Sequence, residues 1–315
     1  MPKFLVGNNT LPPDPHPVDS DWRFSDYSVE RIIQLLPPDG RVLAVGTPSI
    51  ARRLEQYNKD VLLIDRQPLQ GVRNHRAISV GEKILSHNLG SCAVLDPPWY
   101  KVDMQKWLTW SAHLLGANSQ LIFPKWPDST RPTAAQDWDE LVQSILPWGS
   151  IDALGLTVEY QIPPFERHAR LLGGTKMSES PLSGEMVVLH VHERPTFQFQ
   201  EPLVEWHRFV VNDYQLSISL TTTRPKCNAF GFEGTRGRYW PFVSSRAPNR
   251  NMIGVWSSDN EAGCIDNGDE YVELLRRALV APTEEKFELA MQKLNHLRSW
   301  NIPRPPYTRV CEWIQ

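Results

Sequence analysis

The sequence has few cysteines, and none of them stands in a metal-binding or disulfide-rich pattern. The 4 cysteines are Cys92, Cys227, Cys264 and Cys311, which lie far apart and form no Cys-x-x-Cys pair. This spacing argues against a structural zinc site and a disulfide framework, and it favours a reducing compartment. His190 and His192 could share one face of a strand, but no nearby cysteine or acid pattern completes a site, so we expect no metal.

Long apolar runs are also missing. No stretch approaches the ~18 apolar residues of a membrane-spanning helix. The first residues lack the apolar core of a signal peptide. We therefore expect a cytoplasmic protein without a membrane partner. A composition of 41% hydrophobic and 22% charged residues is typical of a globular protein with a full core.

Strong charge of either sign is absent as well. The formal net charge is only −3, so any binding of nucleic acid must use a local basic surface. The sequence lacks the Gly-x-Gly-x-x-Gly fingerprint of dinucleotide-binding folds, and no motif supports Ser-His-Asp or Cys-His catalysis. By contrast, the 27 prolines and 12 tryptophans are high counts, which predict many fixed loops and several stacking surfaces.

Short apolar runs alternate with amphipathic stretches over much of the chain. The expected strands are residues 41–45, 61–64, 92–95 and 120–123, and the expected helices are 26–36, 50–57, 102–115 and 137–146. This alternation predicts a parallel sheet, and two later strands at 156–162 and 186–192 predict an antiparallel pair that closes it. Within the helix at 50–57, we expect Ile50, Leu54 and Tyr57 to share one face.

The sequence predicts three regions. Residues 1–20 are polar and rich in proline, which indicates an irregular lead-in. Residues 21–194 carry the alternating pattern of the sheet, and 195–315 predict an α+β appendage that could recognise a substrate. In this appendage we expect strands at 205–220 and 252–257, followed by two amphipathic helices. The apolar faces of these helices are formed by Tyr271, Leu274, Leu275, Ala278 and Leu279, and by Phe287, Ala290, Met291, Leu294 and Leu297.

The stretch Asp96-Pro97-Pro98-Trp99-Tyr100 follows the apolar run at 92–95. Each proline fixes its own φ and pushes the preceding residue into an extended conformation, so the chain must leave the strand in an open, non-helical turn. This turn offers the Asp96 carboxylate and the Pro97 carbonyl as acceptors, with an aromatic ring directly after them. Such a group suits the holding of an NH2 group for direct alkyl transfer, although a plain surface turn has the same composition.

The loop Gly46-Thr47-Pro48-Ser49 follows the first strand, where nucleotide-like cofactors approach the backbone in doubly wound sheets. Its glycine permits close approach, and the helix that begins there directs N–H groups toward a ligand. Asp65 ends the next strand at a spacing expected for an acid that binds ribose hydroxyls. Together with Asp96, these residues should meet at the carboxyl ends of parallel strands.

These motifs, together with Asp21-Trp22-Arg23-Phe24-Ser25-Asp26, resemble in order the N6-adenine methyltransferase-like family, over roughly residues 20–193. That family includes elongation-factor lysine methyltransferases and a zinc-finger ribosomal RNA adenine methyltransferase. The resemblance implies a class I methyltransferase (Rossmann-like) fold and S-adenosylmethionine as cofactor. It also implies that Phe24, Ser25, Gly46, Thr47, Pro48, Ser49 and Asp65 bind the cofactor, and that Asp96, Pro97, Pro98 and Trp99 are catalytic. Phe24 and Trp99 depart from the family, which usually has Tyr and Phe or Tyr there.

The acceptor is the least defined part of the prediction. The region 224–250 is rich in arginine and aromatic residues, a mixture that suits phosphate contact and base stacking but also an ordinary basic loop. We expect adenine N6 of a nucleic acid as the acceptor. The residues expected to contact it are Tyr100, Arg236, Arg238 and Trp240. The alternatives are a protein lysine as acceptor, and a degenerate fold that binds nucleic acid or protein without turnover. The joint presence of Gly46, Asp65 and Asp96 speaks against degeneracy.

Overall fold

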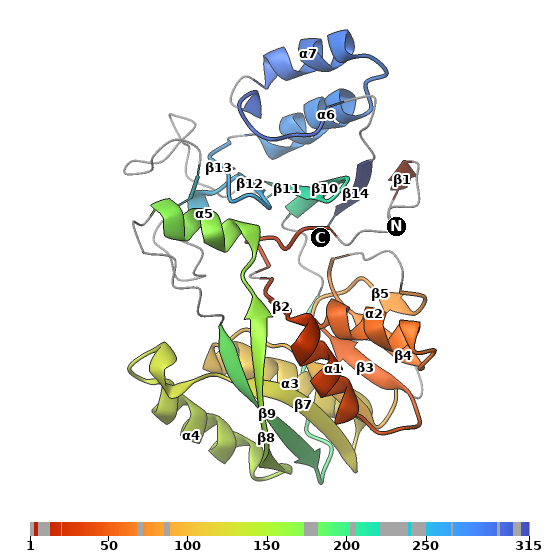
Figure 1. Ribbon diagram of the computed structural model, residues 1–315, viewed down its shortest axis with the longest axis vertical. Helices are drawn as coiled ribbons and strands as arrows, with labels where there is room; N and C mark the ends of the chain where they lie inside the picture. The colour runs from red at the N-terminus through yellow and green to blue at the C-terminus, as the bar shows by residue number, and fades with distance from the viewer. Residues whose placement is uncertain are drawn as a thin grey trace. The chain divides into compact units, whose positions relative to one another are not determined.

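The chain forms two compact units (Figure 1). The computed structural model describes residues 3–5, 13–19, 21–67, 72–84, 89–172, 182–201, 206–220, 239–240, 250–265, 267–294, 297–304 and 310–314. The first unit, here the parallel-sheet unit, comprises Arg23–Gln161 and Ser180–Pro202. The second, here the antiparallel-sheet unit, comprises Met1–Trp22, Ile162–Glu179 and Leu203–Gln315. Each unit is therefore assembled from separate segments of the chain. The division into residues 1–20, 21–194 and 195–315 stays a prediction.

An eight-stranded sheet forms the centre of the parallel-sheet unit, in the order β2-β8-β9-β7-β6-β3-β4-β5. The strands are β2 (Arg23–Phe24), β3 (Val42–Val45), β4 (Val61–Ile64), β5 (His75–Arg76), β6 (Cys92–Leu95), β7 (Ser119–Lys125), β8 (Gly149–Gln161) and β9 (Ser183–Val191). β3 to β7 pair in parallel, while β9 runs antiparallel to both β7 and β8. The predicted fold class is confirmed: a parallel sheet that ends in an antiparallel strand pair.

The central strands are continuous apolar runs because both faces of the sheet are covered. Every residue of β3, β4 and β6 is buried. The helices of this unit are α1 (Asp26–Gln34), α2 (Pro48–Gln56), α3 (Lys101–Leu115) and α4 (Ala134–Ile145). α1 packs with α2, and α3 packs with α4 (Figure 1). Large side chains such as Phe123, Trp110 and Trp126 fill the core between these layers.

The helix ends follow local sequence signals. The Ser25 hydroxyl accepts a hydrogen bond from the Ser28 backbone N–H and caps α1, as expected for serine at this position. Pro48 stands at the start of α2, where its missing N–H costs nothing. Tyr57 differs from the prediction: its side chain is exposed, whereas Ile50 and Leu54 are buried. The reason is that α2 ends at Gln56, and the Tyr57 hydroxyl instead donates to Glu30 at 2.9 Å.

The antiparallel-sheet unit has a six-stranded sheet in the order β1-β14-β10-β11-β12-β13. Its strands are β1 (Lys3–Leu5), β10 (Trp206–Val211), β11 (Tyr214–Ser219), β12 (Val255–Ser257), β13 (Ala262–Gly263) and β14 (Val310–Ile314), and its helices are α5 (Pro164–Leu172), α6 (Gly268–Leu279) and α7 (Glu284–Lys293). Within the stretch 205–220 that was predicted as strand, the described residues 206–219 form a hairpin that turns at Asn212 with φ 60°. Asparagine tolerates this left-handed conformation, which a tight hairpin requires.

Described residues of the segment 1–20, which was predicted to be irregular, pair with or contact the six-stranded sheet. β1 pairs with β14, and the Asp19 carboxylate accepts a hydrogen bond from the buried Arg208 guanidinium of β10 at 2.7 Å. His16 is fully buried, and its ring nitrogen contacts the Trp256 carbonyl at 3.0 Å. Burial lowers the pKa of His16 to about 3, so its imidazole is neutral at physiological pH. The proline pattern gave no sign of these contacts, because they depend on partners far away in the sequence.

The cysteines depart from the expectation in one respect. Cys264 is disulfide-bonded, whereas Cys92 and Cys311 are free. Within the part of the chain that the structure describes, no helix is long and apolar enough to cross a membrane. Over the same residues, no cluster of three or more histidine, cysteine or acidic side chains could hold a metal ion.

Candidate functional site

The candidate site lies at the carboxyl ends of β3, β4 and β6. In the register of the sheet, Val45 is opposite Ile64 on one side and Leu95 on the other. The residues that follow these strand ends are Gly46, Asp65 and Asp96. The Gly46 N–H donates to the Ile64 carbonyl at 2.8 Å, and the Asp96 N–H donates to the Val45 carbonyl at 3.2 Å. Because neighbouring strands lie about 4.8 Å apart, the two acids flank the glycine across roughly 10 Å of sheet edge.

Gly46 has a positive φ of 62°, which favours glycine. An added Cβ would lie 2.6 Å from Cη2 of Trp107 on α3, so the indole ring leaves no room for a side chain. From the sequence, we expect this glycine to let a cofactor approach the backbone closely. The structure adds an intramolecular reason for it, because Trp107 packs directly against the turn.

We expect Gly46→Ala to destabilise the parallel-sheet unit by about 1–3 kcal/mol, because the methyl group overpacks against Trp107 in a strained backbone conformation. Chemical denaturation of both proteins measures this difference. In a Trp107→Ala background, Gly46→Ala should cost less than it does in the wild type, since the clash is absent there. If the single variant is as stable as the wild type, the close packing of Trp107 on Gly46 is refuted.

The amino-terminal end of α2 faces this edge of the sheet. Thr47 is buried, and its hydroxyl donates to the Val94 carbonyl at 3.4 Å, which ties the loop to β6. Pro48 and Ser49 begin the helix, and its first turn contains no acidic residue. The partial positive charge of the helix end is therefore not neutralised by a local carboxylate, which favours a polar or anionic ligand group here.

Asp65 is half-buried and structurally anchored. Its Oδ1 accepts a hydrogen bond from the Gln67 backbone N–H at 2.7 Å, and its carbonyl accepts one from His75 Nε2 at 2.9 Å. Burial lowers the pKa of His75, although the bond to the Asp65 carbonyl works in the opposite direction. These contacts hold the backbone of Asp65 and fix one carboxylate oxygen at the end of β4.

The turn at 96–100 has the open shape that its prolines predict. These residues are non-helical, the Tyr100 N–H donates to the Pro98 carbonyl at 2.8 Å, and α3 begins only at Lys101. The Trp99 carbonyl accepts a hydrogen bond from Arg131 Nη1 at 2.9 Å. Arg131 is held in turn by Asp137 at 2.7 Å and stacks over a tryptophan ring at 4.4 Å. The turn is thus fixed by its own prolines and by an anchored guanidinium.

Tyr160 joins this turn from β8, at the far side of the antiparallel strand pair. Its hydroxyl donates to Asp96 Oδ1 at 2.7 Å, and its ring lies 4.8 Å from Phe24 and 5.8 Å from Trp99, the latter edge-on at 81°. Burial raises the pKa of Tyr160 well above its usual value, and the Asp96 carboxylate raises it further. The hydroxyl therefore remains a donor at physiological pH.

Sequence reasoning missed Tyr160, although a signal for it was present. In the second half of β8, Leu156, Val158 and Tyr160 are buried while the residues between them are exposed. This alternation marks Tyr160 as inward-facing, at the end of a strand next to the predicted site. Its partner could not be inferred, because Asp96 lies 64 positions earlier in the chain.

The predicted acceptor contacts are less well supported. Tyr100 is half-buried and precedes α3. Trp240 is only 3% exposed and packs with Ile253 and Trp256 in the antiparallel-sheet unit, so its ring has no open face for stacking. Arg236 and Arg238 lie outside the described residues, as does most of 224–250.

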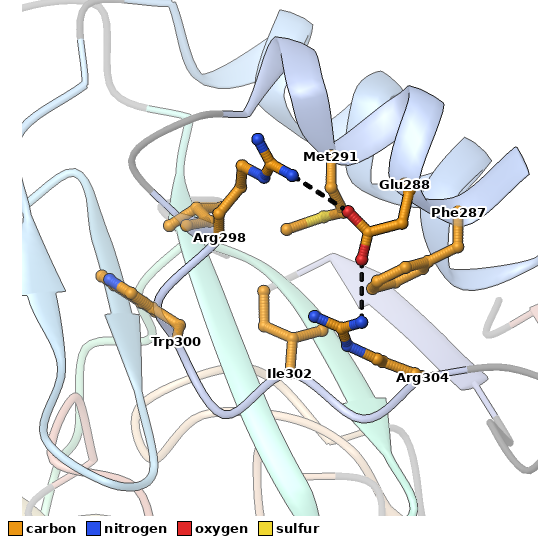
Figure 2. A pocket seen from close by; sticks show the side chains of 8 residues that line it. Phe287, Glu288, Met291, Arg298, Trp300, Ile302 and Arg304 are labelled. Carbon is orange, nitrogen blue, oxygen red and sulfur yellow. Dashed lines mark hydrogen bonds and ion pairs between the residues drawn. The ribbon is translucent and has the colours of Figure 1, made fainter. Parts of the chain in front are cut away.

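A separate pocket of about 180 Å³ lies beside α7 in the antiparallel-sheet unit (Figure 2). Its floor is apolar and buried, and is formed by Phe287, Met291, Leu297, Trp300 and Ile302. At its rim, Glu288 accepts a hydrogen bond from Arg298 at 3.2 Å and forms an ion pair with Arg304 at 2.8 Å (Figure 2). Arg304 also donates to Glu284 at 2.8 Å, so two arginines face two acids. The sequence pattern does not predict this pocket.

No family model and no curated protein matches the chain. Among solved structures, the chain is similar to a branched-chain polyamine synthase C9 mutein from Thermus thermophilus, which was solved in complex with N4-aminopropylspermidine and 5′-methylthioadenosine. The two sequences are 11% identical, the TM-score is 0.48, and the match covers 59% of this chain and 61% of that chain. A 16S rRNA methyltransferase from the same organism, in complex with AdoMet and guanosine, is 12% identical with a TM-score of 0.31, over 72% of this chain and 55% of that one. Geranyl diphosphate C-methyltransferase from Streptomyces coelicolor A3(2) is 7% identical with a TM-score of 0.33, over 53% and 78%.

The chain thus spans about three fifths of the length of the polyamine synthase that it matches. These identities and TM-scores assign no function to the chain. The strand order itself shows the fold: a doubly wound, Rossmann-like parallel sheet that ends in an antiparallel strand pair.

Proposed function

We propose that the parallel-sheet unit binds S-adenosylmethionine and transfers its methyl group to an amino nitrogen, adenine N6 of a nucleic acid. One observation carries this proposal. The sheet register brings Asp65 and Asp96 to either side of Gly46, at adjacent carboxyl ends of parallel strands. In open α/β sheets, ligands bind outside these strand ends, near the point where the strand order reverses.

The residues at this edge fit such a cofactor. Asp65 suits the ribose hydroxyls, because a carboxylate offers two acceptor oxygens and this one is anchored at the end of β4 by the Gln67 N–H. The loop Thr47-Pro48-Ser49 begins a helix without an acid in its first turn, which suits the polar end of the cofactor. Phe24 is buried beside Tyr160 and would form an apolar wall. Ser25 caps α1, so we assign it an indirect role in shaping this wall.

When bound, S-adenosylmethionine supplies an electrophilic methyl group on a sulfonium leaving group. The protein's part is to orient the acceptor. Asp96 and the Pro97 carbonyl would accept hydrogen bonds from the NH2 group, so that its lone pair points at the methyl carbon. The N–C bond would form as the C–S bond breaks, the sulfur would leave as a thioether, and the surplus N–H proton would leave along its hydrogen bond to Asp96. Pro98 keeps the turn rigid, and Trp99 would stack on the acceptor ring. Positioning of this kind accounts for most of the acceleration, because no covalent enzyme intermediate is needed.

Two features favour adenine over lysine as acceptor. The N6 amino group of adenine is neutral, whereas a lysine ammonium must lose a proton before it can attack. The hydroxyl that contacts Asp96 belongs to Tyr160, whose raised pKa makes it unsuited to take that proton at physiological pH. The half-buried indole of Trp99 supports a planar acceptor as well, because base–aromatic stacking contributes roughly 1–3 kcal/mol. An adenine within a duplex would have to be flipped out of the stack.

Labelled methyl transfer onto separated DNA, RNA and protein fractions tests the proposal. We expect label in a nucleic-acid fraction, recovered as N6-methyladenine after hydrolysis. If the basic run 224–250 holds phosphates, the logarithm of affinity should fall with the logarithm of salt concentration by about one unit of slope per phosphate neutralised. Arg236→Ala/Arg238→Ala should flatten this slope without changing cofactor binding.

Label that appears only in the protein fraction, with kinetics insensitive to salt, would assign the acceptor to lysine instead. If no fraction is labelled although the cofactor binds, the chain is a binding module that has kept the fold without turnover. The absence of both binding and transfer would refute the proposal as a whole.

A further inference from the structure

We propose that Tyr160 is a positioning residue that fixes the plane of the Asp96 carboxylate for the acceptor amine. This role rests on the proposed function of Asp96. It is carried by three contacts: the 2.7 Å hydrogen bond from the Tyr160 hydroxyl to Asp96 Oδ1, and the packing of the Tyr160 ring against Phe24 and against Trp99.

The orientation of an aspartate carboxylate needs such a partner. Its terminal torsion is broad and roughly two-fold, so packing alone does not select one plane. A hydrogen bond to one oxygen removes this freedom and directs the second oxygen along a defined line. The Pro97 carbonyl is already fixed by the rigid backbone, so the carboxylate is the one acceptor whose direction must be set by a second residue.

The hydroxyl of Tyr160 has a fixed position from which it can orient the Asp96 carboxylate. Tyr160 is 3% exposed, and its ring is held between Phe24 and Trp99. Because its pKa is raised, it stays protonated and keeps donating across the physiological pH range. The same ring contacts Trp99 edge-on, so one residue sets the carboxylate and also supports the proposed stacking face.

Tyr160→Phe removes only the hydroxyl and keeps both ring contacts. We expect the turnover number, kcat, to fall roughly 10- to 100-fold, as for other small displacements of a reacting group. The KM for the acceptor and the Kd for S-adenosylmethionine should stay within about twofold, since the ring and the cofactor residues are unchanged. Crystal structures of the wild type and the variant should differ in the plane of the Asp96 carboxylate.

Tyr214→Phe is a matched control. Tyr214 is also buried and donates to a buried carboxylate, Glu261 Oε2 at 2.8 Å, but it lies on β11 in the antiparallel-sheet unit. It should lose comparable thermal stability while keeping the wild-type kcat. If Tyr214→Phe loses as much activity as Tyr160→Phe, the effect is one of stability and the positioning role is wrong.

An unchanged Asp96 plane or an unchanged kcat in Tyr160→Phe would also overturn the proposal. The crystallographic comparison separates this failure from that of the proposed function. If the wild-type protein transfers no methyl group to any acceptor, the proposed function fails, and the orientation of Asp96 in the two crystal structures still decides whether Tyr160 fixes it.

Discussion

Asp96→Asn should slow methyl transfer by two to three orders of magnitude and leave cofactor binding nearly intact. An asparagine can still accept the hydrogen bond from Tyr160, so the local packing is preserved. Its NH2 group, however, presents donors where the acceptor amine also presents N–H donors, and this removes one of the two orienting contacts. We expect kcat to fall roughly 100- to 1000-fold, the range for the loss of one preorganised hydrogen-bonding group in an active site.

Initial rates with labelled S-adenosylmethionine measure the fall in kcat. Calorimetric titration checks that the Kd for S-adenosylmethionine is nearly unchanged. Asp60→Asn is the matched control, because Asp60 precedes β4 at the opposite edge of the same sheet and forms an ion pair with Arg41 at 3.0 Å. That pair is solvent-exposed, so its loss should change stability only slightly. An active Asp96→Asn enzyme would mean that the reaction centre lies elsewhere.

Asp65→Ala should weaken the binding of S-adenosylmethionine by about 2–3 kcal/mol, because two hydrogen bonds from the ribose to a charged acceptor are lost. This corresponds to a rise in Kd of roughly 30- to 150-fold. Asp65→Asn separates binding from structure, since its side-chain oxygen can still accept from the Gln67 N–H and keep the turn after β4. It should retain the stability of the wild type and still bind the cofactor more weakly.

Isothermal titration with S-adenosylmethionine and with its demethylated product measures both variants, and Asp60→Asn again serves as the control. Because Asp65 is proposed to contact the ribose, kcat at saturating cofactor should change far less than it does in Asp96→Asn. Binding of NADH in preference to S-adenosylmethionine by the wild-type protein would contradict the assigned cofactor. An unaltered Kd for S-adenosylmethionine in Asp65→Ala would refute the role of Asp65 in binding it.

We therefore expect the two acids to have separable roles, because their neighbours differ. Asp65 is held by backbone groups at the end of β4, while Asp96 stands in a proline turn and contacts a buried tyrosine. A fixed acid beside a helix end suits the recognition of a ligand, whereas an acid whose second oxygen is directed by Tyr160 suits the orientation of an attacking group. Measuring Kd and kcat for both variants tests this division directly.

The sequence by itself determined the local features of the parallel-sheet unit. The apolar runs at 61–64 and 92–95 became β4 and β6 with the bounds expected, because strands buried on both faces need uninterrupted apolar side chains. Pro97 and Pro98 kept the turn open, and Ser25 capped α1, since both effects act over only a few bonds. The placement of acids after strand ends followed from the same runs.

Only the tertiary structure decided which distant residues meet. The hydrogen bond between Tyr160 and Asp96, the packing of Trp107 on Gly46 and the pairing of β1 with β14 all depend on the order of strands in the sheets. Periodicity tells which side of an element is buried, but not which partner covers it. For this reason the sequence predicted the acids of the candidate site, while the tyrosine that contacts one of them became visible only when the folded sheet brought Tyr160 of β8 to the turn after β6.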